Sequence, residues 1–456
     1  MISNINLKLK VKKFIILFGD IVCLYFALFL TLLLRHSGTY TNKIFLLHLP
    51  YFSVIFIFWL VIIFSFRFYE TNKPSLKKYE LLLAISNFSL INFFISILYF
   101  YIIPQNLIAP KTILIINIVT FGLLFYLWRI LASKILYSQS IRKNTIIITN
   151  DENLVQEIIN KPELELNIKA CVDLETTFIS SNLERVKIDG IYNFVKKNGI
   201  LNIIIDEDIL NKKQISNELS QCLNLRVNFI RTNDFYEQFL GRVSIQNINS
   251  VWLINNFNEN KKWVFDIFKN ILDKILAIVF LIPSIALTPL IMIFVKLDSR
   301  GSAFFTQIRT GKNNKKFLAI KFRTMKNDAE KNGPQWTQKN DHRITKIGKF
   351  LRKTRLDEIP QLINIIKGDM SLVGPRPERP EFINKLEKEI PFYKERLLVK
   401  PGLTGWAQIN YPYGNSTQDA LEKLQYDLYY VKHRSLVLDL SIILKTLHTV
   451  IKKGGM

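Results

Sequence analysis

Four long apolar segments fill the first third of the chain, separated by short polar loops. They cover residues 14–34, 44–66, 81–103 and 112–136. Each has about the 20 residues that a helix needs to cross the hydrocarbon core of a bilayer. The first lacks a small-residue cleavage site and is longer than the apolar part of a signal peptide, so we expect it to be retained. The pattern predicts a four-helix transmembrane bundle over residues 1–140.

Basic residues gather in the loops on one side of these segments. They precede the first segment and follow the second and the fourth, and they are Lys8, Lys10, Lys12, Lys13, Arg67, Lys73, Lys77, Lys78, Lys134, Arg142 and Lys143. The opposite loops carry only Arg35, Lys43 and Lys111. Because basic loops stay on the cytoplasmic side, we expect both ends of the bundle in the cytoplasm.

One acidic residue, Asp20, lies inside the first apolar segment. A carboxylate is costly in lipid, so it marks either a functional site or a contact with another helix or the interface. The sequence leaves both explanations open.

The periodicity changes after the fourth segment. Apolar, β-branched runs at 145–149, 203–205 and 227–230 indicate buried strands, with helical patterns between them. This alternation predicts a small parallel α/β domain over residues 141–258. A dinucleotide-binding domain would have a glycine-rich turn after its first strand, but this chain has Asn-Asp-Glu-Asn at 150–153. We therefore expect a degenerate Rossmann-like domain with a structural or regulatory role.

A fifth apolar region covers residues 259–298. An amphipathic approach leads into an uninterrupted apolar run at 275–295, which is long enough to span a membrane. Basic residues lie on both sides of the run, and Pro283 and Pro289 can bend a helix. These features favour a re-entrant membrane helix, with a full crossing as the alternative. Re-entry would leave the remainder, residues 299–456, in the cytoplasm.

Composition agrees with a membrane protein that meets anionic partners. The chain is 49% hydrophobic and carries a formal net charge of +24, which suits anionic lipid or phosphorylated substrates. No nucleic-acid-binding signature is present, so we expect no nucleic-acid partner. The three cysteines and five histidines show neither disulfide nor metal-ligand spacing.

The stretch 352–382, RKTRLDEIPQLINIIKGDMSLVGPRPERPEF, concentrates the candidate chemistry. Its pattern predicts a short helix that Asp357 caps, with Pro360 in the first turn and Gly368 at the end. A helix start among arginines can bind phosphate, and a carboxylate there stays ionised, as a nucleophile requires. The alternative is that the Asp357–Glu358 pair only caps the helix.

Further motifs surround this stretch. They are KLDSRGSAFFTQIRTG at 296–311, KFRTM at 321–325, DHRIT at 341–345, KPGLTGWAQ at 400–408, YDLYY at 426–430 and SLVLD at 435–439. Read in this order, they resemble the bacterial sugar transferases, the polyprenyl-phosphate glycosyl-1-phosphate transferases, from about residue 261 to the C-terminus. The N-terminal bundle and α/β domain resemble the long form of that family. The resemblance implies an integral membrane protein whose catalytic domain is mainly helical, of the α+β class.

The resemblance also assigns roles. It implies that Asp357 attacks the β-phosphate of a UDP-sugar, releasing UMP, and that undecaprenyl phosphate then takes the sugar phosphate from the aspartate. It implies that Glu358 holds Mg²⁺, a cation that favours one or two carboxylates together with phosphate oxygens. The implied phosphate ligands and the lysine expected near the acidic pair are Arg352, Arg376, Arg323 and Lys321.

The same resemblance implies a place and a pathway. It points to the bacterial inner membrane, contact with membrane lipid, a cytoplasmic catalytic domain, a homodimer, and the start of capsule, O-antigen or exopolysaccharide repeat units. Galactose or glucose is the expected sugar, with an N-acetylated sugar possible. An inactive membrane scaffold or regulator of polysaccharide assembly is the alternative, and a glycosyltransferase that releases UDP is a third possibility.

Overall fold

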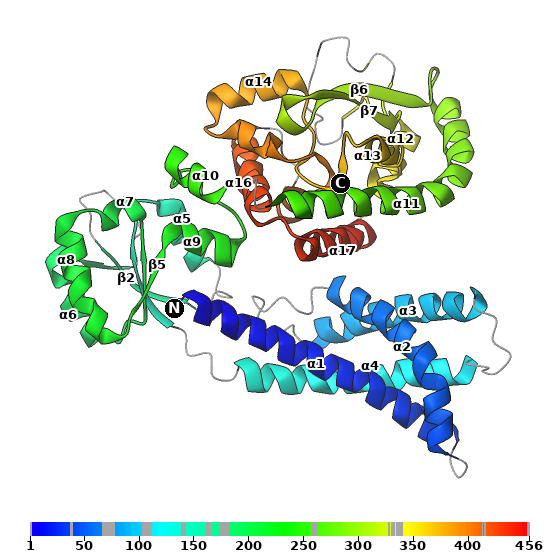
Figure 1. The fold of residues 1–456 in the computed structure, drawn as a ribbon, viewed down its shortest axis with the longest axis horizontal. Helices are drawn as coiled ribbons and strands as arrows, with labels where there is room; N and C mark the ends of the chain where they lie inside the picture. The colour runs from blue at the N-terminus through cyan, green and yellow to red at the C-terminus, as the bar shows by residue number, and fades with distance from the viewer. Residues whose placement is uncertain are drawn as a thin grey trace. The chain divides into compact units, whose positions relative to one another are not determined.

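A computed structural model of the chain divides into two compact units, Met1–Phe235 and Tyr236–Met456, each described here by itself (Figure 1). The structure describes residues 2–36, 40–65, 78–102, 111–137, 143–160, 166–172, 183–257, 262–326, 329, 333, 341–412, 414 and 416–453. Several basic residues that determine the expected orientation, among them Arg67, Lys73 and Arg142, lie outside these ranges.

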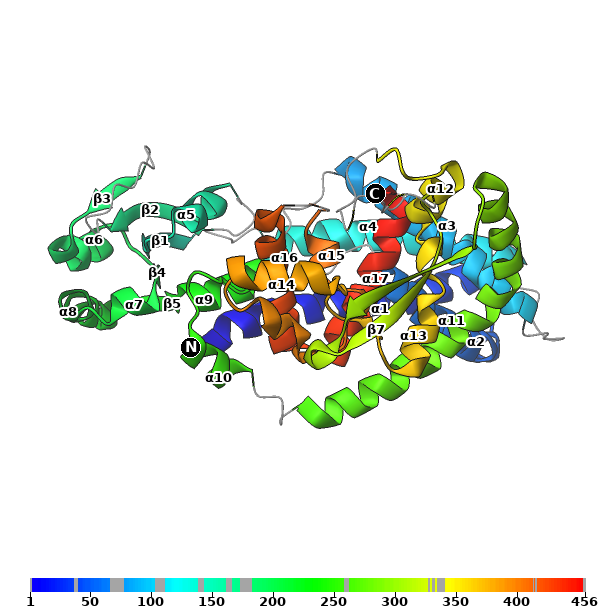
Figure 2. The same ribbon diagram turned by 90° about the horizontal axis from the view of Figure 1, so that it is seen from above.

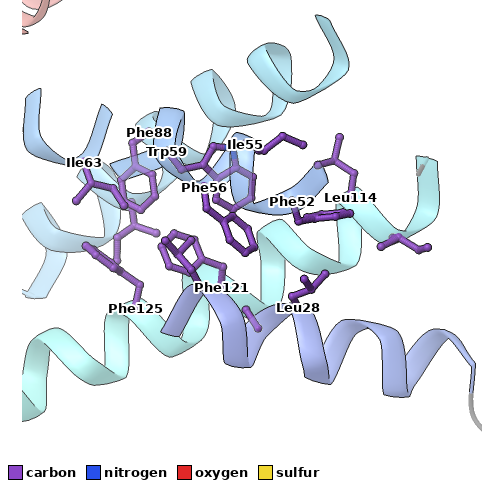
Figure 3. Packing of buried hydrophobic residues seen from close by; sticks show 14 of the residues in the cluster. Leu28, Phe52, Ile55, Phe56, Trp59, Ile63, Phe88, Leu114, Phe121 and Phe125 are labelled. Carbon is purple, nitrogen blue, oxygen red and sulfur yellow. The ribbon is translucent and has the colours of Figure 1, made fainter. Parts of the chain in front are cut away.

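The first unit begins with four long apolar helices. They are α1 (Ile2–Arg35), α2 (Asn42–Ser65), α3 (Lys78–Ile102) and α4 (Lys111–Tyr137). Their shared core is rich in aromatic rings, and Trp59 packs against Phe56 and Phe121 (Figure 3). Side chains on the outer faces, such as Phe18 and Leu123, are also apolar. A helix that is apolar on all sides is typical of a membrane span.

Asp20 pairs with a basic residue of another helix. Its Oδ2 lies 2.6 Å from Nη2 of Arg129 on α4, and the Asp20 side chain is fully buried. Helices α1 and α4 therefore share a charged contact, which supports the helix-contact explanation of this residue.

The rest of the first unit is a parallel α/β domain, as the sequence predicts. Its sheet has the order β3-β2-β1-β4-β5 and consists of β1 (Lys143–Ile148), β2 (Leu166–Val172), β3 (Glu184–Val186), β4 (Asn202–Ile205) and β5 (Asn228–Arg231). The helices that alternate with these strands are α5 (Glu152–Ile159), α6 (Ile191–Lys197), α7 (Glu207–Leu210), α8 (Lys213–Gln221) and α9 (Thr232–Phe235). Isoleucines of β1 and β4 form the centre of the core because both strands are covered on each face.

A carboxylate lies where this type of sheet usually binds a ligand. Open α/β sheets bind ligands beyond the carboxyl ends of the strands at the point where the strand order reverses, here between β1 and β4. Asp206 directly follows β4, and its Oδ2 accepts hydrogen bonds from Thr149 Oγ1 (2.7 Å) and Asn150 N (3.0 Å). Thr232 donates to its other oxygen. The chain supplies its own anion at this position.

The second unit contains α11 (Trp263–Asp298), the fifth of five described helices that are long and apolar enough to cross a membrane. The ribbon bends partway along α11, so its two halves run in different directions (Figures 1 and 2). Pro283 and Pro289 lie inside the helix, and Ser284 and Thr288 donate hydrogen bonds to carbonyls one turn earlier. Prolines and such hydroxyl bonds are known causes of helix bending.

Helices with two small sheets follow α11. An antiparallel hairpin joins β6 (Phe304–Thr310) to β7 (Lys316–Phe322), and β8 (Ser371–Val373) pairs in parallel with β9 (Gly402–Thr404). The helices are α12 (Lys346–Thr354), α13 (Gln361–Lys367), α14 (Pro380–Glu389), α15 (Trp406–Asn410), α16 (Thr417–His433) and α17 (Leu436–Lys453). This unit is mainly helical with two-stranded sheets, as expected.

A buried charge cluster ties α11 to this core. Lys269 Nζ lies 2.6 Å from Asp439 Oδ2 of α17 and 3.5 Å from Asp273 Oδ2 of α11. The hydroxyl of Tyr430 donates to Asp439 Oδ1, and that of Ser371 donates to Asp273 Oδ2. The first half of α11 is thereby fixed to α16, α17 and β8.

Residues from Tyr236 onward, including α10 (Ser250–Asn256), belong to the second unit. Val243 and Ile248 are buried in one cluster with Ile383 and Leu424. These apolar partners lie more than a hundred residues further along the chain, so local patterns could not place the segment.

Candidate active site

Asp357 lies in a tight turn rather than at the start of a helix. The helix α12 ends at Thr354, its C-cap residue Arg355 has a left-handed φ of +60°, and a 3-10 turn covers Leu356–Glu358. Pro360 occupies the N-cap position of α13 and makes no side-chain capping bond. The prediction that Asp357 caps this helix is therefore wrong. Its carboxylate is buried, and its Oδ1 has no hydrogen-bond partner among the described residues.

Glu358, the second acid, is surrounded by cations. Its Oε1 accepts hydrogen bonds from Lys321 Nζ of β7 and from Arg376 Nη2, both at 2.8 Å. Its Oε2 lies 3.8 Å from Arg355 Nη1. Burial by itself raises the pKa of Glu358, but Arg376, Lys321 and Arg355 outweigh burial and hold this pKa well below its usual value. These cations therefore favour the ionised form of Glu358.

Asp357 behaves in the opposite way. Burial, followed by the negative charge of Glu358, raises the pKa of Asp357, although Lys321, Arg352 and Arg376 counteract this. Two neighbouring acids thus have pKa values pushed apart, a pattern typical of sites where carboxylates have different tasks. An unpaired carboxylate oxygen that is poorly solvated is also a better nucleophile than a hydrated one.

Lys321 faces the acidic pair, as expected. Burial lowers its pKa, while Glu358 counteracts the effect. Its ammonium group contacts Glu358 directly and so neutralises that charge. Lys321 and Arg376 together supply two positive groups on a single carboxylate oxygen.

Arg352 approaches the site from α12. Its Nε donates to Thr324 Oγ1 at 2.8 Å, which fixes the side chain next to the end of β7. The contact depends on Gly348, because a Cβ there would lie only 2.1 Å from Thr324 O. Arg352 also lowers the pKa of Asp357, which shows that its charge acts on the carboxylate.

The structure does not bring Arg323 to the acidic pair in the same way. This buried guanidinium donates to Arg300 O (2.8 Å), Ser299 O (2.6 Å) and Val295 O (3.3 Å). It therefore satisfies carbonyls at the C-terminal end of α11, where helical partners are missing.

The Gly-Pro-Arg-Pro turn reaches the site through close backbone packing. A Cβ at Gly374 would lie 2.3 Å from Lys400 O, and one at Gly402 would lie 2.0 Å from Gly374 N. Only glycine allows these two segments to approach so closely. The glycines of the motifs at 374 and 402 thus place the backbone that carries Arg376.

Two arginines near this turn, Arg309 and Arg396, were not among the predicted site residues. Arg309 donates to Pro377 O at 3.1 Å, and Arg396 donates to Arg376 O at 3.0 Å. Arg309 lies inside the QIRTG motif, which could have drawn attention to it. Nothing local marks Arg396, whose partner Asp427 is distant in sequence.

The acidic pair fits a magnesium ion that also binds substrate phosphates. Within the described residues, no three His, Cys, Asp or Glu side chains are close enough together to hold a metal ion by themselves. Mg²⁺, however, is often held by one or two carboxylates and completed by phosphate oxygens. Asp357 Oδ1 has no hydrogen-bond partner among the described residues, and Glu358 Oε2 lies 3.8 Å from Arg355 Nη1.

A buried carboxylate among arginines and a lysine, with one oxygen that no described residue binds, is suited to phosphoryl transfer. Such transfer depends mainly on positioning and on neutralising phosphate charge. The family model described as bacterial sugar transferase matches residues 264–453, which include this site. An exopolysaccharide production protein of Rhizobium leguminosarum bv. phaseoli is 37% identical over 42% of this chain and 96% of its own length. The chain therefore belongs to the bacterial sugar transferase family.

Two longer relatives carry specific names. A UDP-N-acetylgalactosamine-undecaprenyl-phosphate N-acetylgalactosaminephosphotransferase of Aeromonas hydrophila is 38% identical over 52% of this chain and 55% of its own length. A UDP-glucose:undecaprenyl-phosphate glucose-1-phosphate transferase of Xanthomonas campestris pv. campestris is 35% identical over 57% of this chain and 54% of its own length. The chain thus matches about half the length of these relatives.

Proposed function

We propose that the protein transfers a hexose-1-phosphate from a UDP-sugar to undecaprenyl phosphate and releases UMP. The observation that carries the proposal is the buried Asp357 carboxylate, whose Oδ1 has no partner in the described part of the chain, beside the cation-bound Glu358. The names of the relatives support this reaction class.

The proposed reaction has two steps. In the first, Asp357 Oδ1 attacks the β-phosphorus of the UDP-sugar, and the bond from that phosphorus to the bridging oxygen breaks, so UMP leaves with the oxygen. In the second, a phosphate oxygen of undecaprenyl phosphate attacks the same phosphorus and the bond to Asp357 breaks. The carboxylate is regenerated, and the sugar is left on an undecaprenyl diphosphate. A direct transfer between two anions is difficult, and a covalent intermediate divides it into two easier steps.

The charged neighbours have separate proposed roles. Arg376 and Arg352 bind phosphate oxygens, and Lys321 neutralises charge beside the acidic pair. Glu358 Oε2 would hold Mg²⁺, which when bound neutralises charge on the diphosphate. For Arg323 the contacts support a role in fixing the end of α11, so that it acts on phosphate only indirectly.

The membrane arrangement is also a proposal. Helices α1–α4 would form a four-span bundle in the bacterial inner membrane, and the bent α11 would enter and leave the bilayer on the cytoplasmic side. Basic residues on both sides of α11 and its two internal prolines support re-entry. This geometry allows one site to meet a soluble UDP-sugar and a lipid phosphate. By resemblance we further propose a homodimer.

A UDP-sugar panel tests the activity. Membranes containing the protein, undecaprenyl phosphate and Mg²⁺ are incubated with UDP-glucose, UDP-galactose or the N-acetylated analogues, and released nucleotide is identified. We expect UMP and a lipid-linked sugar with glucose or galactose, which would start a capsule, O-antigen or exopolysaccharide repeat unit. Release of UDP would indicate transfer of the sugar alone, and no nucleotide release would indicate an inactive scaffold.

The covalent step has its own test. Without undecaprenyl phosphate, one equivalent of UMP should be released and a phosphohexose should be found by mass spectrometry on the peptide containing Asp357. Asp357→Asn should lower UMP release by at least roughly 10³-fold, because a neutral amide is a poor nucleophile. The matched control is Asp208→Asn, an exposed aspartate of α7. Full activity of Asp357→Asn would exclude the covalent mechanism.

A further inference from the structure

The Gly-Pro-Arg-Pro turn depends on outside donors for its geometry. Pro375 and Pro377 have no N–H, so the turn cannot satisfy its own carbonyls. Four successive carbonyls accept hydrogen bonds from elsewhere: Pro375 O from Gly402 N (2.9 Å), Arg376 O from Arg396 Nη2 (3.0 Å), Pro377 O from Arg309 Nη1 (3.1 Å) and Glu378 O from Thr310 N (2.9 Å). Two of these donors are backbone amides and two are guanidinium groups.

Arg396 is built into the core to make its bond. Its Nε and Nη2 lie 3.0 and 2.8 Å from Asp427 Oδ2, its Nη1 donates to Tyr393 Oη at 3.1 Å, and its side chain is 6% exposed. A buried ion pair is costly to form and is not by itself evidence of added stability. Here the ion pair with Asp427 fixes the plane of the Arg396 guanidinium, and Nη2 of that guanidinium also donates to Arg376 O.

Arg309 approaches the same turn from β6. Its Nη2 lies 2.5 Å from Gln307 Oε1, and its Nη1 lies 3.8 Å from Glu378 Oε2 in addition to the bond to Pro377 O. The two guanidiniums thus hold two successive carbonyls, those of Arg376 and Pro377. The guanidinium of Arg376 itself meets Glu358 Oε1 at 2.8 Å.

We propose that Arg396, oriented by Asp427, and Arg309 are positioning residues that hold the Arg376 backbone so that its guanidinium meets Glu358 and the substrate phosphate. Neither residue needs to touch the substrate. The inference rests on the proposed function for the identity of the phosphate donor. A shift of about 1 Å in a positioning group can cost about 10²-fold in rate.

Double-mutant kinetics test this. Arg396→Lys keeps a charge for Asp427 but cannot supply the planar set of donors that also reaches Arg376 O. We expect kcat/KM for the UDP-sugar to fall by about 10²-fold in the otherwise native protein. In an Arg376→Gln background, the same substitution should change kcat/KM by less than about threefold, because the group that Arg396 positions is absent. Arg309→Lys should show the same dependence on Arg376.

The KM for the UDP-sugar separates positioning from loss of folded protein. Because Arg376 is proposed to bind a substrate phosphate, its displacement should raise KM, whereas a smaller folded fraction would lower only the apparent kcat. Arg434→Lys is the matched control, since Arg434 is also buried, binds a carboxylate (Asp266) and donates to a carbonyl (Val431 O), but away from the turn. It should leave KM unchanged.

The result that overturns the inference is an equal loss in both backgrounds, or no loss in Arg396→Lys. The affinity for UDP-glucose, measured by titration on each variant, separates this result from a failure of the proposed function. A native protein that binds UDP-glucose without releasing UMP would refute the function. Even then, the positioning inference would stand if Arg396→Lys weakened UDP-glucose binding in the otherwise native protein but not in the Arg376→Gln background.

Discussion

Replacing Lys269 tests the charge cluster that fixes α11 to the transferase core. Lys269→Met leaves the carboxylates of Asp273 and Asp439 buried, each with one hydroxyl donor, from Ser371 and Tyr430. Removing one partner of a buried ion pair costs about 3–5 kcal/mol. Because the hydroxyl donors remain, we expect the lower end of that range. For a unit of roughly 200 residues, each kcal/mol lowers Tm by about 2–4 °C, so Tm should fall by about 6–12 °C.

The assay is thermal unfolding in detergent micelles at one fixed scan rate, because unfolding of such a protein is commonly irreversible. The control is Lys385→Met, whose side chain is 60% exposed and lies 3.9 Å from Glu389. It should change stability by no more than about 0.5 kcal/mol. Adding Asp439→Asn to Lys269→Met should restore part of the loss, since it removes one uncompensated charge. Equal Tm values for Lys269→Met and Lys385→Met would refute the reasoning.

Three further predictions concern other parts of the chain. The attack requires ionised Asp357, and the pKa of this residue is raised. As the pH falls, activity should therefore be lost at a higher pH than the pKa of an ordinary aspartate would give. A pH–kcat profile checks this, and an acid limb at the ordinary position would contradict it. Arg129→Leu should destabilise the protein by about 3 kcal/mol by leaving Asp20 unpaired in the helix core, whereas Arg129→Leu combined with Asp20→Leu should recover stability in the same thermal assay. Gly374→Ala should reduce activity, measured as UMP release, by at least about tenfold, because its Cβ would lie 2.3 Å from Lys400 O. The comparison is Gly199→Ala, whose Cβ would meet no atom within 4 Å, so that this variant tests only the strain of a positive φ.

The sequence predicted those parts of the fold that depend on local patterns. Long apolar runs indicated the five apolar helices, and short β-branched runs indicated β1, β4 and β5, because each pattern reports how one segment is buried. The packing of the segment after Tyr236 could not be predicted, since its partners Ile383 and Leu424 come from a different part of the chain. The start of α13 was misplaced because the left-handed Arg355 inserts a separate turn before it.

The positions of the candidate site residues could be predicted only in part. Motif resemblance indicated Lys321 and Arg376, and the structure places both on one oxygen of Glu358. The same motif block suggested Arg323, but residue type does not show where a guanidinium points, and this one meets the end of α11. Arg396 gave no local signal because its function is to hold a backbone carbonyl that is distant in sequence.

The carboxylate of Asp206 has a consequence for what the α/β domain can sense. A side chain attached to β4 is always present at high effective concentration next to Thr149, Asn150 and Thr232. A free phosphate or nucleotide would have to displace this tethered competitor and would meet its negative charge. We therefore expect this edge of the sheet to bind a free phosphate or nucleotide weakly.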